Sequence, residues 1–304
     1  MPDLRVKVAN VEFPTPVFVA SGTFGYGEEA SSLAEVRSLG AIITKSISPE
    51  PRIGNPPPRL FETTAGLLNS IGLANVGVEA FVTQKLPFLR STGVPIIVNV
   101  VGKVGEDFVR VVERLEAEGS ISGYELNLSC PNVKEGGLEF SQNFRVAADL
   151  TADVRRRTKR LLMPKLTPNV TSVAEIARAV EDAGADAVSL INTLTGMAVD
   201  IDTWKPRINT VIGGYSGPAI KPVALAKVYQ VAMAVKIPVV GIGGITCWQD
   251  AVEFFLAGAL AVQVGTANFI NPRTAIEMVD GLRAYLERKR CSRIQELIAQ
   301  MRRL

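Results

Sequence analysis

The chain has 304 residues, of which 47% are hydrophobic and only 6% aromatic, so it can fill a large core with aliphatic side chains. Its 33 Lys and Arg residues against 30 Asp and Glu residues leave a net charge of +3, which indicates neither a nucleic-acid-binding nor a membrane-surface protein. Histidine is absent, which excludes Ser-His-Asp and Cys-His catalysis and any His-ligated metal, and we expect no metal site.

Eight apolar, strand-like runs alternate along the chain with segments of helical period. The runs cover residues 17–22, 41–46, 95–102, 123–130, 161–167, 187–193, 237–244 and 261–267. Between them, for example at 106–119, apolar side chains recur on one helical face. This alternation predicts parallel strands joined by right-handed crossovers. We therefore expect an α/β protein in which residues 1–304 form one (β/α)8 TIM barrel, with its active site at the C-terminal strand ends.

The segments outside these units give further expectations. Residues 1–16 are predicted to form a hairpin across the bottom of the barrel, and residues 286–304 a basic amphipathic helix that packs on the barrel or contacts a partner. Three connections, 47–94, 131–160 and 194–236, are longer than simple βα loops and begin at the predicted catalytic face.

The three cysteines are widely separated and form no C-x-x-C pair. This pattern is typical of reduced thiols in a cytoplasmic protein rather than of a disulfide framework or an iron–sulfur site. The N-terminus lacks the apolar stretch of a signal peptide, and no uninterrupted run reaches about 18 apolar residues. We therefore expect a cytoplasmic protein that does not span a membrane.

Every predicted strand ends in a residue that can bind a ligand or do chemistry. In strand order these residues are Ser21, Lys45, Asn99, Asn127 with Cys130, Lys165, Asn192 with Thr193, Gly243 with Gly244, and Gly265 with Thr266. Because the C-terminal strand ends of a TIM barrel form its active-site face, we expect these residues to share one site.

Glycine-rich segments follow the last two strands, GIGGI at 241–245 and VGTANF at 264–269. In many barrels these two loops bind a phosphate through backbone N–H groups. The pattern indicates a phosphorylated substrate or flavin mononucleotide (FMN), although glycines used only for tight turns would give the same spacing.

Three further features leave alternatives open. Cys130 precedes Pro131 at a strand end, where it is either an inert buried thiol or a reactive group among polar neighbours. Lys45 and Lys165 are candidates for a Schiff base, for a fixed charge beside an anionic ligand, or for simple snorkelling at the rim. Amides at the barrel mouth suit a flat ring edged with N–H and C=O groups, such as a pyrimidinedione, although each could be a turn residue; they are Asn69, Asn99, Asn127, Asn132 and Asn192.

Several longer segments resemble one known family. They are SGTFGYG (21–27), TKSI (44–47), GNPPPRLFET (54–63), LLNSIGLANVGVE (67–79), NLSCPNVKEGG (127–137), PKLTPN (164–169), INT (191–193), GGYSGPAIKP (213–222), VVGIGGI (239–245) and AVQVGTANF (261–269). Along nearly its whole length the chain resembles the class 1 dihydroorotate dehydrogenases, which are flavin enzymes of pyrimidine biosynthesis. The NVKEGG segment resembles subclass 1B in particular.

The resemblance implies a role for each matching position. Cys130 is implied to be the catalytic base. The implied dihydroorotate or orotate site comprises Lys45, Asn69, Ser70, Ile71, Gly72, Leu73, Asn127, Asn132, Asn192 and Thr193. The implied FMN site comprises Ser21, Lys45, Ser46, Asn99, Asn127, Lys165, Ile191, Gly217, Gly243, Gly244, Gly265 and Thr266.

The resemblance also implies the reaction and the assembly. Dihydroorotate is oxidised to orotate with hydride transfer to FMN, and electrons pass to NAD through a partner subunit that carries FAD and a 2Fe–2S cluster. The implied assembly is a homodimer core within a heterotetramer. A self-contained fumarate-linked enzyme, a dihydropyrimidine dehydrogenase-like FMN barrel, a Schiff-base aldolase at Lys165 and a non-catalytic scaffold remain as alternatives.

Overall fold

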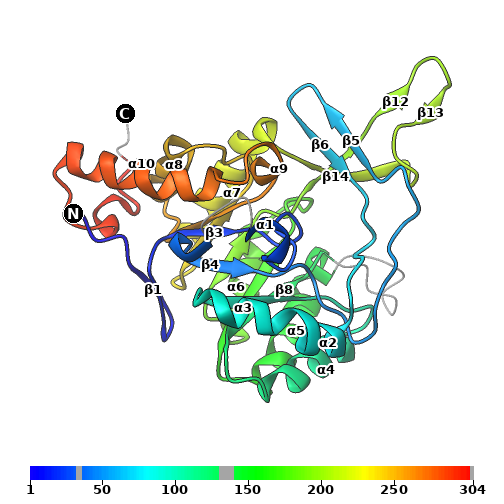
Figure 1. Cartoon of the computed structure of the whole chain (residues 1–304), viewed down its shortest axis with the longest axis horizontal. Helices are drawn as coiled ribbons and strands as arrows, with labels where there is room; N and C mark the ends of the chain where they lie inside the picture. The colour runs from blue at the N-terminus through cyan, green and yellow to red at the C-terminus, as the bar shows by residue number, and fades with distance from the viewer. Residues whose placement is uncertain (32–35, 130–139, 302–304) are drawn as a thin grey trace.

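The computed structural model describes residues 1–31, 36–129 and 140–301, and its centre is a closed barrel of eight parallel strands (Figure 1). In barrel order the strands are β10 (Val188–Leu190), β15 (Val239–Ile242), β16 (Ala261–Val264), β3 (Val17–Val19), β4 (Ala41–Ile43), β7 (Ile96–Val100), β8 (Ile121–Asn127) and β9 (Leu161–Leu166). Each overlaps one of the eight predicted runs, so the predicted (β/α)8 TIM barrel is confirmed.

Helices surround the barrel and bury their apolar stripes against it. The longer ones are α3 (Leu86–Thr92), α4 (Gly105–Glu116), α5 (Phe144–Arg155), α6 (Val173–Asp182), α7 (Lys221–Ala232), α8 (Trp248–Leu256) and α10 (Thr274–Lys289). Shorter helical segments are α1 (Glu28–Ser31), α2 (Val78–Ala80), a π-helix (Phe81–Lys85), α9 (Ala267–Ile270) and 3-10 turns at Val36–Ser38, Phe140–Gln142, Pro218–Ile220 and Ile294–Leu297.

Helix α6 illustrates why the sequence folds in this way. The Ser172 side chain accepts a hydrogen bond from the backbone N–H of Glu175, which caps the first turn. Val173, Ile176 and Val180 recur at helical spacing and are buried. Gly184, with a φ of 95°, then turns the chain back toward β10.

A second sheet stands above the C-terminal end of the barrel as an arm, which is formed by two of the long connections (Figure 1). Its antiparallel strands are β11 (Leu194–Met197), β14 (Ile212–Ser216), β6 (Gly66–Asn69) and β5 (Leu60–Thr63), in that order, and the ribbon of β12 (Val199–Asp200) and β13 (Lys205–Pro206) extends it. The Arg207 guanidinium packs over the Phe61 ring at 5.2 Å from its centroid. The sequence predicted long connections here but not this sheet.

The two ends of the chain meet beside the barrel. The predicted N-terminal hairpin is present as β1 (Val6–Val8) paired with β2 (Val11–Phe13). The predicted helix over 286–304 is wrong, because α10 ends at Lys289 and Arg290 takes a left-handed φ of 59°. After that turn the backbone bonds to the N-terminus instead of continuing a helix: Asp3 donates to Ser292 and accepts from Ile294. Within the described ranges, no helix is long and apolar enough to cross a membrane.

Candidate active site

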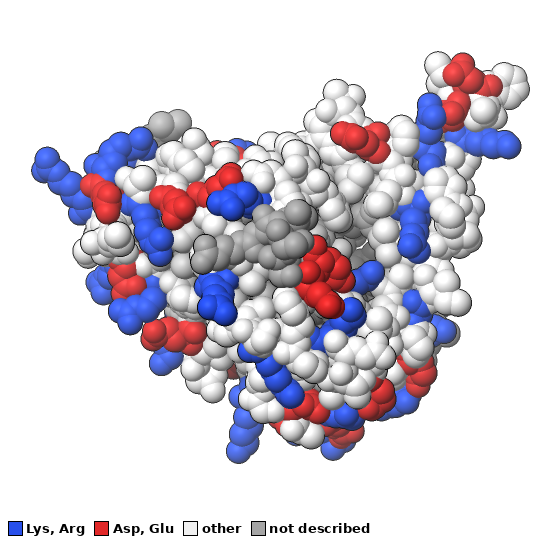
Figure 2. All heavy atoms as spheres, in the orientation of Figure 1, with Lys and Arg blue, Asp and Glu red and all other residues white. Residues whose placement is uncertain are grey.

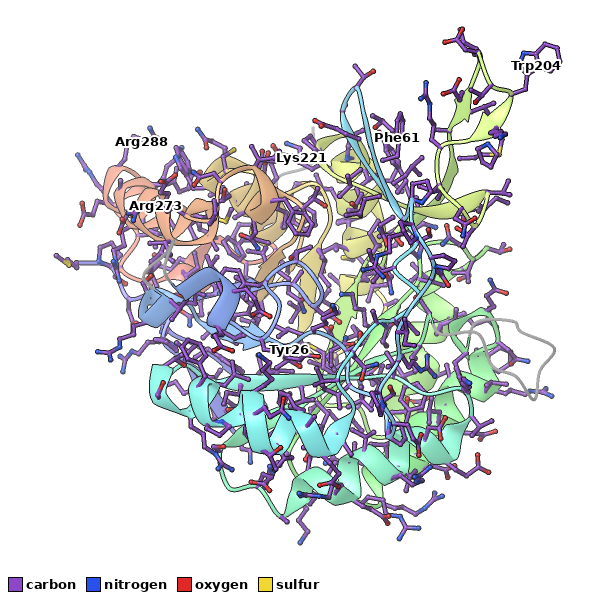
Figure 3. The ribbon with its side chains drawn as sticks, turned by 45° about the vertical axis from the view of Figure 1, so that its right-hand side comes forward. Tyr26, Phe61, Trp204, Lys221, Arg273 and Arg288 are labelled. Atoms are coloured by element: carbon purple, nitrogen blue, oxygen red, sulfur yellow. The ribbon has the colours of Figure 1, made fainter. Side chains whose placement is uncertain are left out.

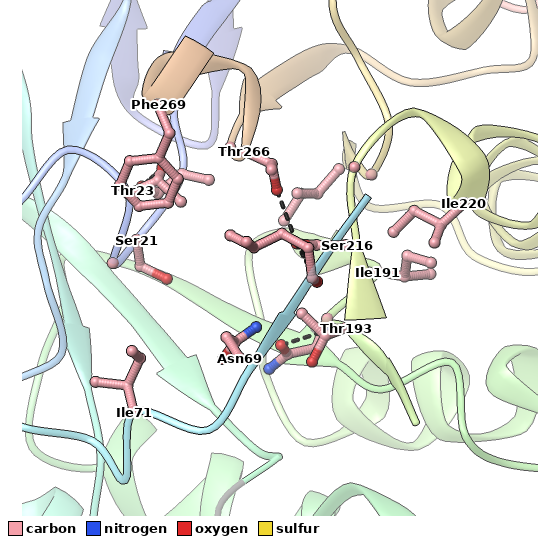
Figure 4. Close-up of a pocket in the computed structure, with 18 of the residues that line it drawn as sticks. Ser21, Thr23, Asn69, Ile71, Ile191, Thr193, Ser216, Ile220, Thr266 and Phe269 are labelled. Atoms are coloured by element: carbon pink, nitrogen blue, oxygen red, sulfur yellow. Dashed lines mark hydrogen bonds between the residues drawn. The ribbon is translucent and has the colours of Figure 1, made fainter. Parts of the chain in front are cut away.

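The C-terminal mouth of the barrel holds a cavity of about 480 Å³, which the arm roofs on one side (Figure 4). This volume is typical of a site for a small ligand or cofactor. Most of the predicted site residues line it: Ser21, Lys45, Ser46, Asn69, Ser70, Ile71, Gly72, Leu73, Asn127, Lys165, Ile191, Asn192, Thr193, Gly217, Gly243, Gly244, Gly265 and Thr266. The fold thus brings together residues that are scattered over almost the whole sequence.

Of the predicted site residues that the structure describes, one does not line the cavity, and two more, Cys130 and Asn132, lie outside the described residues. Asn99 is fully buried below the cavity, where its Oδ1 accepts a 2.7 Å hydrogen bond from the hydroxyl of Ser46. Ser46 does line the cavity, so Asn99 supports a lining residue from behind.

The charge of the lining is one-sided. Among its described residues, Lys45, Arg59 and Lys165 are cationic and none is acidic. Lys165 is only 5% exposed, and its ammonium donates to the Ser21 hydroxyl over 3.2 Å. Such a pocket favours anionic ligands, because a buried cation gains most from an opposite charge. Elsewhere in the described part of the chain, no three His, Cys, Asp or Glu side chains gather as metal ligands would.

The glycine turn after β15 brings bare backbone to the cavity wall. Gly243 and Gly244 have φ values of 124° and 71°, and a Cβ atom on Gly244 would lie 2.6 Å from the backbone nitrogen of Lys221. The turn is held by Asp250, which accepts from Thr246 at 2.8 Å and from the Lys221 ammonium at 2.7 Å. The hydrogen bonds that the Lys221 ammonium donates to Asp250 and Glu253 raise the pKa of Lys221 to about 12. A rigid turn of this kind suits an anion that approaches the main chain closely.

Amide side chains form a second group at the strand ends. Asn192 donates to Oδ1 of Asn127 over 3.2 Å, and its own Oδ1 accepts from the backbone N–H of Thr193 over 2.8 Å. Asn69 enters from the arm and donates to the carbonyl of Gly214 over 3.2 Å (Figure 4). These bonds fix three amides against the cavity, where they can present donors and acceptors to a ligand.

Sequence reasoning missed several residues of the wall. Ser216 on β14 accepts a 2.8 Å hydrogen bond from the Thr266 hydroxyl and so ties the arm to the end of β16 (Figure 4). Arg59 and Phe269 also line the cavity, and the Ser70 hydroxyl is buried without a partner. A signal existed for all three, since Arg59 lies in the GNPPPRLFET segment, Ser216 in GGYSGPAIKP and Phe269 at the end of VGTANF, whereas the bond between Ser216 and Thr266 depends on the fold.

The chain is similar to known proteins over nearly its whole length, and the matches agree on one family. A family model described as dihydroorotate dehydrogenase matches residues 3–286. The chain is 51% identical over 300 residues to a protein of Geotalea uraniireducens named dihydroorotate dehydrogenase B (NAD(+)), catalytic subunit, covering 99% of this chain and 98% of that one. Proteins with the same name from Geobacter sulfurreducens and a Thermoanaerobacter species are 50% and 47% identical over 300 residues, covering 99% of this chain and 98% and 99% of their own lengths.

Proposed function

We propose that this chain, which belongs to the dihydroorotate dehydrogenase family, is the catalytic subunit of an NAD-linked dihydroorotate dehydrogenase. It oxidises dihydroorotate to orotate in pyrimidine biosynthesis. The observation that carries this function is the cavity itself, whose described lining combines three cations with ordered amides and contains no acid. Both a flavin phosphate and an orotate carboxylate are anions, and both the flavin and orotate rings carry N–H and C=O groups. The relatives carry the NAD-linked name, so a fumarate-linked enzyme is not favoured.

The family is one of flavin enzymes, and FMN is the cofactor that we propose for this chain. Gly243 and Gly244 line the cavity in a turn of positive φ, and the N–H groups of this turn are proposed to meet the phosphate. Lys165 and Ser21 present a cation and a hydroxyl deeper in the cavity, where they suit the polar edge of a flavin ring. When bound, FMN supplies the acceptor for the hydride that leaves C6 of dihydroorotate.

The remaining lining residues are proposed to hold and orient the substrate. Lys45 and the segment 69–73 offer a charge and backbone amides for the carboxylate, while Asn127, Asn192 and Thr193 meet the ring. Because the Asn127 and Asn192 side chains are already hydrogen-bonded to their neighbours, little ordering of these two amides is left for substrate binding to impose. Their contribution is therefore positioning of C6 for hydride transfer.

Cys130 is proposed as the base that removes the proton from C5 of dihydroorotate. This carbon lies beside a carbonyl group, so its proton is acidic enough for a thiolate. The assignment rests on the NLSCPN segment, since Cys130 and Asn132 lie outside the described residues.

We further propose the assembly and the compartment. A catalytic subunit implies a separate partner, which we propose to carry FAD and a 2Fe–2S cluster and to bind a homodimer of this chain in a heterotetramer. Exposed apolar side chains on the arm support association: Trp204 is 88% and Ile201 80% exposed, and Trp204 points away from the molecule (Figure 3). We propose that residues 1–304 act as one FMN-binding domain, in the cytoplasm, where the three cysteines would stay reduced.

The surface charge fits this picture of a protein with small anionic ligands. Lys and Arg side chains are interspersed with Asp and Glu over the face drawn in Figure 2, without a continuous basic surface.

Ligand binding by the purified chain tests the function. The chain should bind FMN with one flavin per subunit, and orotate should perturb the flavin spectrum at concentrations where uracil, which lacks the carboxylate, does not. Equal responses to orotate and uracil would favour a dihydropyrimidine dehydrogenase-like barrel instead. A chain that cannot be loaded with FMN would contradict the proposed function.

A further inference from the structure

A carboxylate lies inside the barrel, below the cavity. Glu125 is in the middle of β8, and it is completely buried. Its side chain points into the barrel interior, because it contacts β16 on the opposite wall as well as the neighbouring strands. Glu125 itself does not line the cavity.

Polar groups from four other strands surround both oxygens of this carboxylate. Oε1 accepts from the Asn99 amide at 2.7 Å and lies 3.5 Å from the Lys165 ammonium. Oε2 accepts from the Ser189 hydroxyl at 2.9 Å and from the Gln263 amide at 2.7 Å. Three donated hydrogen bonds and one cation thus compensate this carboxylate in a place where an unpaired one would be very costly.

Stability alone is a weak reason for this arrangement, since a buried ion pair often contributes no more than a well-packed apolar cluster. The position of its partners gives a better reason. Lys165 lines the cavity and also contacts Ser21, and Asn99 holds the hydroxyl of Ser46, which lines the cavity too. Glu125 thus contacts Lys165, which lines the proposed flavin site, and Asn99, which supports that site from behind through Ser46.

We propose that Glu125 is a positioning residue that fixes Lys165 at the proposed flavin site and lowers the reduction potential of a flavin bound there. This inference rests on the proposed function. Reduction adds negative charge to the flavin, and the Lys165 cation favours that charge. The carboxylate of Glu125 offsets part of this attraction through the low-dielectric interior of the barrel. A lower potential eases the onward transfer of electrons to a weakly oxidising acceptor such as NAD.

The neighbourhood of Glu125 allows a clean neutral substitution. Glu125→Gln keeps the shape of the side chain and removes its charge. If the new amide nitrogen takes the place of Oε2, it faces the Ser189 hydroxyl and the Gln263 amide, which are also donors. The side chain of Gln263 has a spare acceptor, however, because its Oε1 is buried without a partner. If the Gln263 amide turns over, that oxygen accepts from the new amide, and the Ser189 hydroxyl can rotate. The fold is therefore expected to survive the substitution.

The test is a spectroelectrochemical titration of the FMN-loaded protein. Glu125→Gln should raise the flavin midpoint potential, with the equilibrium constant for reduction rising about tenfold, the scale expected for removal of a nearby charge in a protein interior. Ser189→Ala is the matched control, since it removes one donor to the same carboxylate but no charge, and its potential should equal that of the wild type. Flavin bound to Glu125→Gln with a wild-type potential would overturn the proposal and leave Glu125 a purely structural residue.

A second variant keeps the test decisive if Glu125→Gln does not fold. Glu125→Asp keeps the charge but draws the carboxylate away from Lys165, so it should raise the potential by a smaller amount, and an unchanged potential there would again overturn the proposal. Wild-type protein that binds no FMN would instead contradict the proposed function itself, so the two failures are distinguishable.

Discussion

Asn192 donates its side-chain amide to Oδ1 of Asn127 over 3.2 Å, and this bond links the carboxyl ends of β10 and β8 at the cavity wall. Asn127 is the last residue of β8, and Oδ1 of Asn192 also accepts from the backbone N–H of Thr193, so two bonds hold the Asn192 side chain. The bond between the two amides sets the orientation of both, because Asn127 uses its Oδ1 and Asn192 its nitrogen.

Asn192→Ala should lower kcat/KM for dihydroorotate about tenfold, because a substrate contact is lost and the Asn127 amide is no longer held. Asn209→Ala is a suitable control, since Asn209 is an exposed asparagine on the arm, away from the cavity lining. Steady-state kinetics with both variants give the comparison. A wild-type kcat/KM in Asn192→Ala would remove Asn192 from the substrate site.

Gly265→Ala tests the phosphate end of the cavity separately from the fold. A Cβ atom there would meet only the Cβ of Ala20, at an ordinary 3.6 Å, so the thermal stability should hardly change. The new methyl group would project beside the proposed phosphate, and the Kd for FMN should rise about tenfold, as for one lost hydrogen bond to a charged group. Gly119→Ala, with open space around it, should change neither quantity. Unaltered FMN affinity in Gly265→Ala would place the phosphate elsewhere.

Lys165→Met should destabilise the protein without any ligand present. The substitution leaves the completely buried Glu125 carboxylate without its cation, and breaking such a pair costs about 3–5 kcal/mol. The double variant Lys165→Met with Glu125→Gln should recover much of that loss, because no uncompensated charge remains. Denaturant unfolding of the apo proteins measures both effects. If the double variant is no more stable than Lys165→Met, the two side chains are not coupled in the way their geometry indicates.

Asp250→Asn should lower the free energy of unfolding at neutral pH, and it should lower it less at acidic pH. Burial by itself raises the pKa of Asp250, but the hydrogen bonds from Lys221 and Thr246 outweigh it, so the pKa lies below its usual value. Such a carboxyl stabilises the fold above its unfolded-state pKa, and this contribution is lost as the pH falls through its folded-state pKa.

At neutral pH the loss in Asp250→Asn should be about 1–3 kcal/mol, the scale of hydrogen bonds to a charged group. The difference from wild type should shrink as the pH falls below about 4. Thermal unfolding at neutral and acidic pH measures it, with the largely exposed Asp280→Asn as the control. A difference that stays constant down to low pH would contradict the role of the Asp250 charge.

Cys130→Ala should retain bound FMN but lose most of its reduction by dihydroorotate, because general-base catalysis contributes roughly 10²–10⁴-fold. Cys130→Ser should also be impaired, since a hydroxyl is a poorer base than a thiol at neutral pH. Rapid-mixing measurements of flavin reduction, with flavin content determined in parallel, separate catalysis from binding. Full activity in Cys130→Ala would refute the assignment of the base.

The barrel and most of its mouth could be predicted because their signals are local. Each strand is a short apolar run, and the residue that ends it, such as Lys45 or Asn127, is visible in the same few letters. Asn99 shows the limit of this reasoning. It lies near the end of β7, yet it is fully buried and supports Ser46 from behind instead of lining the cavity, and no local pattern in the sequence indicates this.

The arm and the interior charge could not be predicted because they depend on long-range pairing. Asn69 on β6 pairs with Gly214 on β14, and nothing local in either segment indicates the other. Glu125 is visible as an acid within an apolar run, but its four partners come from four different strands. The C-terminal tail has the composition of a helix, yet backbone bonds to Asp3 replace the last helical turns.

The most direct test of the proposed function is the visible spectrum of the FMN-loaded chain, recorded before and after anaerobic addition of dihydroorotate. We expect the yellow flavin band to be lost on addition, with one orotate formed for each flavin reduced. Dihydrouracil, which lacks the carboxylate, should leave the band unchanged. A flavin band that persists in the presence of dihydroorotate would contradict the claim that this cavity oxidises it.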